Sequence, residues 1–457
     1  HNTLVGKGAG GSLNSGGYHV LIGSGAGASM TTNTLGSVAV GYNALASQTV
    51  KGRTVAIGVQ SLTALDQTGQ DDYNIAMGYR SGYTLTTGLK NIFIGAFAGQ
   101  ETKGSQNTFV GYHAGTYAGP TSDSTYIGLS AGAYATGSQN TFVGSEAGKG
   151  GTTSAPYSSG QYNTAVGYQA LVAFTTGEQN VAIGRQAGIA ITSGDDNIVI
   201  GKSVATNLTT GTNNIAIGED ALDLENSGTY QLAIGYRAGY KNRISSVSYN
   251  TFIGASAGRE NTSGNNNTYV GHGAGYGVDA GHGGKNTAVG RYAIFHILGD
   301  NTTAIGYQAG YYTSGSNNTF LGSNAGRGGT TSAPFSSGQE SVAIGYQALQ
   351  NFTTGGANVA IGYQAGNDIT TGNNNVFIGK LAGDLVTTGT NNVVVGSGAL
   401  GSADGLEREN TAIGFGAAGG INNDSAIRNV FIGEYAGYGG TGAFNYSVAI
   451  GYNALKS

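Results

Sequence analysis

The chain has 457 residues, of which 85 are glycine and 3 are proline, and it lacks cysteine and tryptophan. Because cysteine is absent, disulfide frameworks and thiolate metal sites are excluded. Charged residues make up 10% and the formal net charge is −4, which excludes a basic nucleic-acid-binding surface. Collagen is excluded because glycine does not recur at every third position. Hydrophobic residues make up 39% and fall at fixed positions, which argues against disorder.

An aliphatic residue followed by glycine recurs along the whole chain, and it defines the predicted elements. We count 26 such pairs, most often 17 residues apart, with extremes of 16 and 23. The predicted strands are short β-branched and apolar runs that end, in chain order, at Val5, Ile22, Val40, Ile57, Met77, Ile94 and so on to Ile450. The glycine after each run permits a sharp corner. A second short extended segment and a turn such as Thr175-Thr176-Gly177 then complete one repeat, which we call a rung.

The columns of the repeat are best described by numbering its glycine as position 0. Position −1 is aliphatic, position −2 is always apolar, often alanine and otherwise frequently aromatic, position +3 is nearly always alanine, and position −4 is asparagine in most rungs. One rung cannot bury its own apolar face, so rungs must stack. The sequence therefore predicts an all-β fold: a parallel β-solenoid, or β-roll, of about 26 rungs of ~17 residues. It further predicts one continuous array over residues 1–457, with an asparagine ladder along the axis.

Positions −1 and −2 point to opposite faces of a strand, yet both are apolar throughout. One face can look into the core of the rung, and the other then needs a cover. We expect a homo-oligomer, with three chains favoured. A wider solenoid with a second layer over that face is the alternative.

A longer period overlies the short one. Residues 148–161 recur, with conservative changes, as residues 326–339, an offset of 178 residues or ten rungs. Both copies lie in the 23-residue intervals, so an extension of about six residues should protrude from the wall at each place. The repetition indicates that the chain grew by duplication of blocks of rungs, which is expected of a shaft whose length is under selection.

The runs Ser341-Val342-Ala343-Ile344-Gly345 and Ser447-Val448-Ala449-Ile450-Gly451 resemble the head repeat of trimeric autotransporter adhesins (the YadA-like head). The array is also similar to shaft repeats of phage tail fibres and bacterial surface fibres. The resemblance implies a left-handed, trimeric β-roll used for attachment at a cell or virion surface. The rung here is longer than the head repeat, and these 457 residues contain no pattern of a stalk coiled coil or a membrane anchor.

Catalytic chemistry finds little support in the sequence. The carboxylate pairs Asp71-Asp72 and Asp195-Asp196 fall in turns, where aspartate usually caps the backbone. His272 and His282 share a neighbourhood, but the repeat places no third metal ligand beside them. We therefore expect no enzyme activity, cofactor or metal. Turnover of a polysaccharide would contradict this expectation.

Tyrosine is the more informative residue type. It occupies position +1 in nine rungs, in a column that elsewhere carries charged residues and should face solvent: Tyr42, Tyr79, Tyr112, Tyr168, Tyr236, Tyr307, Tyr346, Tyr363 and Tyr452. These rings could contact sugars or a partner, or pack on one another along the axis. Tyr157 and Phe335, in the two extensions, are the better contact candidates because loops vary without disturbing the stack. Tyr168, Tyr346 and Tyr363 complete the candidate contact surface.

The sequence favours an extracellular, cell-surface or virion fibre shaft that attaches to a glycan or protein through loops and exposed aromatic residues. It begins at His1 without an initiator methionine or signal peptide, so we expect a processed chain or a piece of a longer one. No apolar run reaches membrane-spanning length. The alternative is an extracellular filament subunit that stacks end to end, because both termini fall within rung motifs. An ice-binding solenoid is less favoured because threonine lies in turns and in the mixed −3 column.

Overall fold

A computed structural model describes residues 1–457 except 32–33, 50–51, 67–70, 153, 244–246, 278–282, 297, 332–334, 403–404, 406, 422–425, 440–443 and 457. The chain divides into two compact units, His1–Thr229 and Tyr230–Ser457. Each unit is a parallel β-solenoid, and the described residues contain no helix. A membrane-spanning helix is accordingly not found among them. The β-solenoid class and the ~17-residue rung are thus confirmed, while left-handedness, the trimer and one array over residues 1–457 stay predictions.

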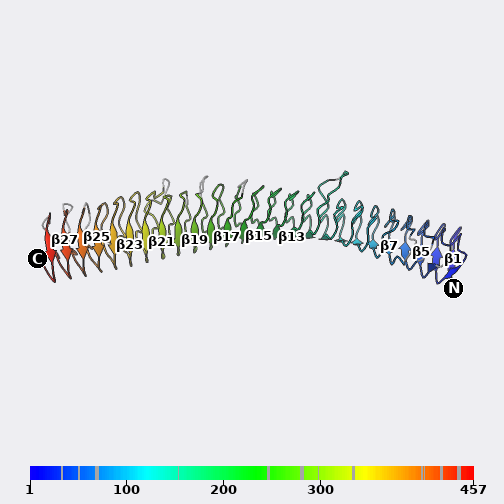
Figure 1. Ribbon diagram of the computed structural model, residues 1–457, viewed down its shortest axis with the longest axis horizontal. Helices are drawn as coiled ribbons and strands as arrows, with labels where there is room; N and C mark the ends of the chain where they lie inside the picture. The colour runs from blue at the N-terminus through cyan, green and yellow to red at the C-terminus, as the bar shows by residue number, and fades with distance from the viewer. Residues whose placement is uncertain are drawn as a thin grey trace. The chain divides into compact units, whose positions relative to one another are not determined.

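In the first unit, each strand pairs in parallel with the next one in the same register, and Figure 1 shows the successive turns side by side. The main sheet consists of β1 (Thr3–Val5), β3 (Val20–Ile22), β5 (Val38–Val40), β6 (Val55–Ile57), β7 (Ile75–Met77), β8 (Ile92–Ile94), β9 (Thr108–Val110), β10 (Thr125–Ile127), β11 (Thr141–Val143), β12 (Thr164–Val166), β13 (Val181–Ile183), β14 (Ile198–Ile200) and β15 (Ile215–Ile217). A small second sheet pairs β2 (Gly16–Gly17) with β4 (Thr34–Leu35).

The second unit repeats this arrangement. Its sheet consists of β16 (Leu232–Ile234), β17 (Thr251–Ile253), β18 (Thr268–Val270), β19 (Thr287–Val289), β20 (Thr303–Ile305), β21 (Thr319–Leu321), β22 (Val342–Ile344), β23 (Val359–Ile361), β24 (Val376–Ile378), β25 (Val393–Val395), β26 (Thr411–Ile413), β27 (Val430–Ile432) and β28 (Val448–Ile450). All of these strands end at the position −1 that the sequence predicted.

The glycine that follows each strand is required by backbone contact with the next rung. Gly167 has a φ of +134°, and a β-carbon there would lie 2.5 Å from the carbonyl oxygen of Gly184. The same approach between rungs recurs at Gly345, whose β-carbon would lie 2.4 Å from the oxygen of Gly362. A side chain cannot fit in that space, so the column is glycine in every rung.

The core of a rung is narrow and is filled from both walls. Position −2 of the strand and positions +3, +4 and +7 of the opposite wall are buried, as Ala165, Ala170, Leu171 and Phe174 illustrate. Aromatic residues at −2 stack along the axis in the first unit. The ring centroids of Phe109 and Tyr126 are 4.5 Å apart and nearly parallel, and those of Tyr126 and Phe142 are 5.0 Å apart.

The predicted asparagine ladder is present and buried. Asn197 donates its side-chain amide to Oδ1 of Asn180 at 3.0 Å and to the carbonyl of Gly211 at 2.8 Å. Its own Oδ1 accepts the backbone N–H and the side-chain amide of Asn214, both at 3.0 Å. Each amide therefore joins the start of a strand to a turn and to the neighbouring rung, which satisfies polar groups that the narrow core would otherwise leave unpaired.

Candidate contact surface

The outward face of each strand carries an apolar residue at position −1 and an aliphatic residue or threonine at position −3. While position −2 is buried in every rung but the first, where Leu4 is exposed, the side chains of Ile183, Ile305 and Ile378 at position −1 are 38%, 39% and 36% exposed. Position −3 holds valine, isoleucine or threonine, such as Val181 and Thr303, and is half-buried in most rungs. The expectation that both strand faces are apolar is thus correct, and one of them is solvent-accessible in a single chain. We call these two columns the outer stripe.

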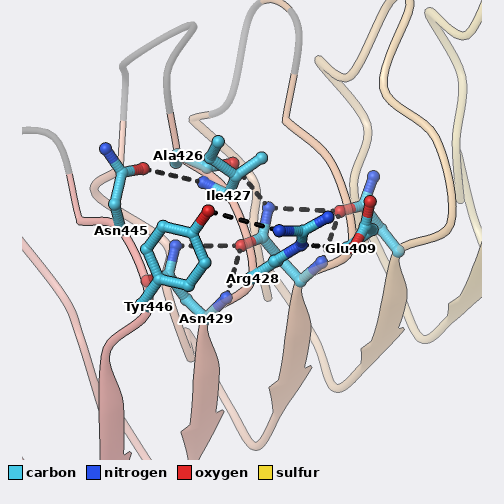
Figure 2. Close-up of polar contacts among 9 residues, drawn as sticks. Glu409, Ala426, Ile427, Arg428, Asn429, Asn445 and Tyr446 are labelled. Atoms are coloured by element: carbon cyan, nitrogen blue, oxygen red, sulfur yellow. Dashed lines mark hydrogen bonds and ion pairs between the residues drawn. The ribbon is translucent and has the colours of Figure 1, made fainter.

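Polar and charged side chains border the outer stripe at position −5. In the second unit, Arg428 donates from Nε to Oε2 of Glu409 at 2.7 Å and from a terminal nitrogen to the hydroxyl of Tyr446 at 3.2 Å. Figure 2 shows this guanidinium between the two partners, next to Asn429 of the ladder. Hydrogen bonding to Glu409 raises the pKa of Arg428, and the same contact lowers the pKa of Glu409.

The tyrosine column at position +1 faces solvent, as predicted. Tyr168, Tyr346 and Tyr363 are 46%, 44% and 47% exposed. The rings of Tyr346 and Tyr363 stack with centroids 5.4 Å apart, and Nζ of Lys380 lies 6.0 Å from the centroid of Tyr363. Tyrosine rings of this column therefore stack along the axis where consecutive rungs, such as those of Tyr346 and Tyr363, both carry tyrosine. The adjacent rungs carry Ser145 and Arg185 at the position of Tyr168, so its column neighbours are not aromatic.

The first extension, between β11 and β12, rises beyond the neighbouring turns of its unit (Figure 1). Its base is fixed by a hydrogen bond from the N–H of Ser158 to the carbonyl of Tyr134 at 3.0 Å. The ring of Tyr157 folds back on Tyr134 and on Tyr117, with centroids 5.9 Å and 5.5 Å away. Tyr157 therefore closes a cluster of three half-buried rings on the wall.

The second extension has the same anchorage, and residues 332–334 of it lie outside the described residues. The N–H of Ser336 donates to the carbonyl of Tyr312 at 2.9 Å. The ring of Phe335 packs on His296, with centroids 4.4 Å apart, and near Tyr312. Phe335 is only 9% exposed, so the expectation that it projects from the wall as a contact residue does not describe its position. Its ring holds the extension against the wall, because burying the apolar ring is more favourable than exposing it to water.

The candidate catalytic residues occupy different environments. Asp195 accepts the backbone N–H of Glu178 at 2.8 Å, as expected of a turn aspartate. Asp72 is instead fully buried, accepts from Thr54 at 3.1 Å and from Gln48, and its pKa is raised to about 6, chiefly by burial. His272 contacts the ring of Tyr292, and His282 lies outside the described residues. The described part of the chain contains no group of three or more residues arranged to hold a metal ion.

The second unit contains a cavity that the sequence pattern did not predict. Glycines replace larger residues at positions +2 and +5 of two consecutive rungs: Gly398, Gly401, Gly416 and Gly419. They leave a cavity of about 450 Å³ between Leu381 and Asp384 on one side and Tyr435 and Tyr438 on the other. The four glycines can be recognised in the sequence. That they form one cavity follows only from the register between neighbouring rungs.

These features define a β-solenoid repeat protein with a patterned outer surface. No family model and no curated protein matches the chain.

Proposed function

We propose that this chain is a structural and adhesive fibre segment of a cell or virion surface, assembled as a homo-oligomer of three copies. The observation that supports this most directly is the outer stripe, which repeats at every rung beside a −2 column that is buried in every rung but the first. Exposed aliphatic stripes on parallel strands are usually covered.

A second copy of the chain is the cover that best fits the stripe. Rungs repeat at about 4.8 Å along the axis, and a partner must carry the same repeat to match the stripe over its length. In one unit the stripe is about 60 Å long and about 10 Å wide, roughly 600 Å². That is close to the about 800 Å² that each partner buries in a stable interface. The resemblance to trimeric adhesin repeats favours three copies.

Attachment would use the surfaces that the outer stripe leaves free. The first extension, with Tyr157 and the exposed residues before it, and the partly exposed side chain of Tyr168 are available to a glycan or protein partner. A catalytic role has less support, because the carboxylates that the turns bring near one another serve the backbone or the core.

The mass of the purified chain in solution tests the assembly. We expect three times the 45.8 kDa of one chain by light scattering. Combining Val166→Glu, Ile183→Glu and Ile200→Glu on the outer stripe should yield single chains with an unchanged β-sheet spectrum. The matched control is Thr176→Glu, Ser193→Glu and Thr210→Glu, which places the same three charges on exposed turns of the same rungs.

The possible results separate the hypotheses. A single-chain mass for the unaltered protein, or loss of assembly in the control as well, would contradict assembly through the outer stripe. Fibres of unlimited length in electron micrographs would favour the alternative, a filament subunit that stacks end to end.

A further inference from the structure

The cavity on the second unit is a gap in the layer of side chains that the neighbouring rungs carry. At position +2 the rungs before the gap carry Gln347, Gln364 and Leu381, and the rung after it carries Tyr435. At position +5 the corresponding residues are Gln350, Asn367, Asp384 and Tyr438. The two intervening rungs have glycine at both positions. We call the resulting space, with its volume of about 450 Å³, the glycine notch.

Aromatic rings form one end of the glycine notch. The ring of Tyr435 lies directly against the wall, since a β-carbon on Gly416 would be 2.9 Å from its Cδ1. Phe415 and Tyr438 meet this ring edge to face, with centroids 5.3 Å and 5.2 Å away. Phe415 is 52% exposed. This end therefore offers a preformed apolar surface whose rings hold one another in place.

The opposite end is polar. Oδ1 of Asp384 is buried and has no hydrogen-bond partner in the described part of the chain, and it lies 3.3 Å from the point where a β-carbon of Gly401 would stand. Burial raises the pKa of this carboxyl, while hydrogen bonds from the backbone N–H groups of Asp384 and Leu385 oppose the rise. Ser397 and Lys380 line the same space, and the ammonium of Lys380 lies 6.0 Å from the ring centroid of Tyr363 on the preceding rung. A buried acceptor without a donor is unfavourable, so a ligand hydroxyl that donates to Asp384 would be stabilised.

We propose that the glycine notch binds a pyranose sugar. A pyranose has a hydrocarbon face for Tyr435 and Phe415 and hydroxyls, one of which can donate to Asp384. The volume falls in the range of small-molecule sites, about 300–1,000 Å³.

A cationic ligand fits the glycine notch less well. Aromatic rings beside a carboxylate could attract an ammonium ion, but a positive charge already stands against these rings. Nζ of Lys456 is 4.5 Å from the centroid of Tyr435. Its charge repels a further cation at the aromatic end.

The most specific test variant is Gly398→Gln, which fills the notch with a residue type that occupies the same position in other rungs. Gly398 has a φ of +64°, and no atom lies within 4 Å of the point where its β-carbon would stand. Gln347 and Gln364 occupy the same position of other rungs with φ of 57° and 52°. Gly398→Gln should therefore fold normally while its side chain occupies the sugar site. Gly8→Gln is the matched control, since Gly8 holds the same position in the first unit, with a φ of +71° and equally open space.

The test is saturation-transfer NMR on the full chain with the methyl pyranosides of glucose, galactose, mannose and N-acetylglucosamine, and with tetramethylammonium as the cation probe. We expect transfer to at least one pyranoside, an affinity at least about tenfold weaker in Gly398→Gln and in Asp384→Asn, and no change in Gly8→Gln. Absence of transfer to every pyranoside, equal binding by Gly398→Gln, or binding of tetramethylammonium alone would overturn the proposal. The proposal does not depend on fibre assembly, which the mass measurement tests separately.

Discussion

The ring of Phe109 lies against Gly115, six residues further along the same rung, and a β-carbon on Gly115 would be only 2.5 Å from the ring. The same relationship holds for Tyr126 and Gly132, at 2.4 Å. Rungs with alanine at −2 use leucine at +4 instead in several cases, as in Ala165 with Leu171, both fully buried. The two columns therefore share one volume, which either an aromatic ring or a leucine fills.

This shared volume predicts the outcome of exchanging the two side chains. Phe109→Ala should leave a cavity and lower the free energy of unfolding by about 3–5 kcal/mol. Gly115→Leu should also destabilise the protein, because the leucine would collide with the ring. The double variant should recover most of either loss, since Ala165 and Leu171 already form that pair and Leu171 has a φ of 53°, close to the +58° of Gly115.

Urea denaturation of the four proteins, followed by circular dichroism, measures the coupling. Losses that simply add in the double variant would contradict a shared volume.

The asparagine ladder should tolerate a shorter polar residue better than an apolar one. Asn197→Leu removes the partners of Asn180, Gly211 and Asn214 inside the core, and we expect a loss of about 2–4 kcal/mol. Asn197→Ser should cost less, because Ser124 and Ser341 hold this column elsewhere and Oγ of each accepts the next rung's N–H, at 3.2 Å and 3.3 Å. Hydrogen exchange of the Asn214 amide reports the local effect. Equal losses for the two variants would show that shape, rather than hydrogen bonding, governs the column.

Asp72 should make stability depend on pH in the weakly acidic range. Burial raises its pKa to about 6, helped by the neighbouring charges of Asp71 and Asp66 and opposed by hydrogen bonds from Thr54 and Gln48. The folded protein then binds more protons than the unfolded chain between about pH 4 and pH 6, so this group lowers stability as the pH rises through that window. The full effect above pH 6 is about 3 kcal/mol.

Asp72→Asn keeps an acceptor for Thr54 and Gln48 but cannot ionise. We expect it to be more stable than the unaltered protein at pH 7 and about equal to it at pH 4, by thermal unfolding. A variant that is destabilised equally at both pH values would contradict an ionised, buried Asp72.

The regularity of the chain explains how much its sequence could predict. Strand ends such as Ile183, the Asn197 ladder and the exposure of Tyr346 follow from columns, because every rung repeats the same environment. Three features required contacts between rungs. Phe335 is buried by His296, which lies two rungs earlier; Asp72 is buried by Gln48 and Thr54 of preceding rungs; and the glycine notch needs the register of neighbouring turns. The position of a side chain that differs from the rest of its column therefore depends on contacts with other rungs, which the repeat pattern alone does not predict.

The two extensions should differ in what their aromatic residues contribute. Phe335 is 9% exposed and packs on His296, whereas Tyr157 is only half-buried against Tyr117 and Tyr134. Phe335→Ala should therefore lower the free energy of unfolding by about 2–3 kcal/mol, and Tyr157→Ala by about 1 kcal/mol or less. If Tyr157 contacts a surface partner, Tyr157→Ala should weaken binding of the fibre to target cells or immobilised glycans with little change in stability. Limited proteolysis separates the effects, because release of the second extension by Phe335→Ala should expose a new cleavage site near residue 330. Equal stability losses for both variants would mean that the duplicated extensions are held in the same way, despite their different exposure.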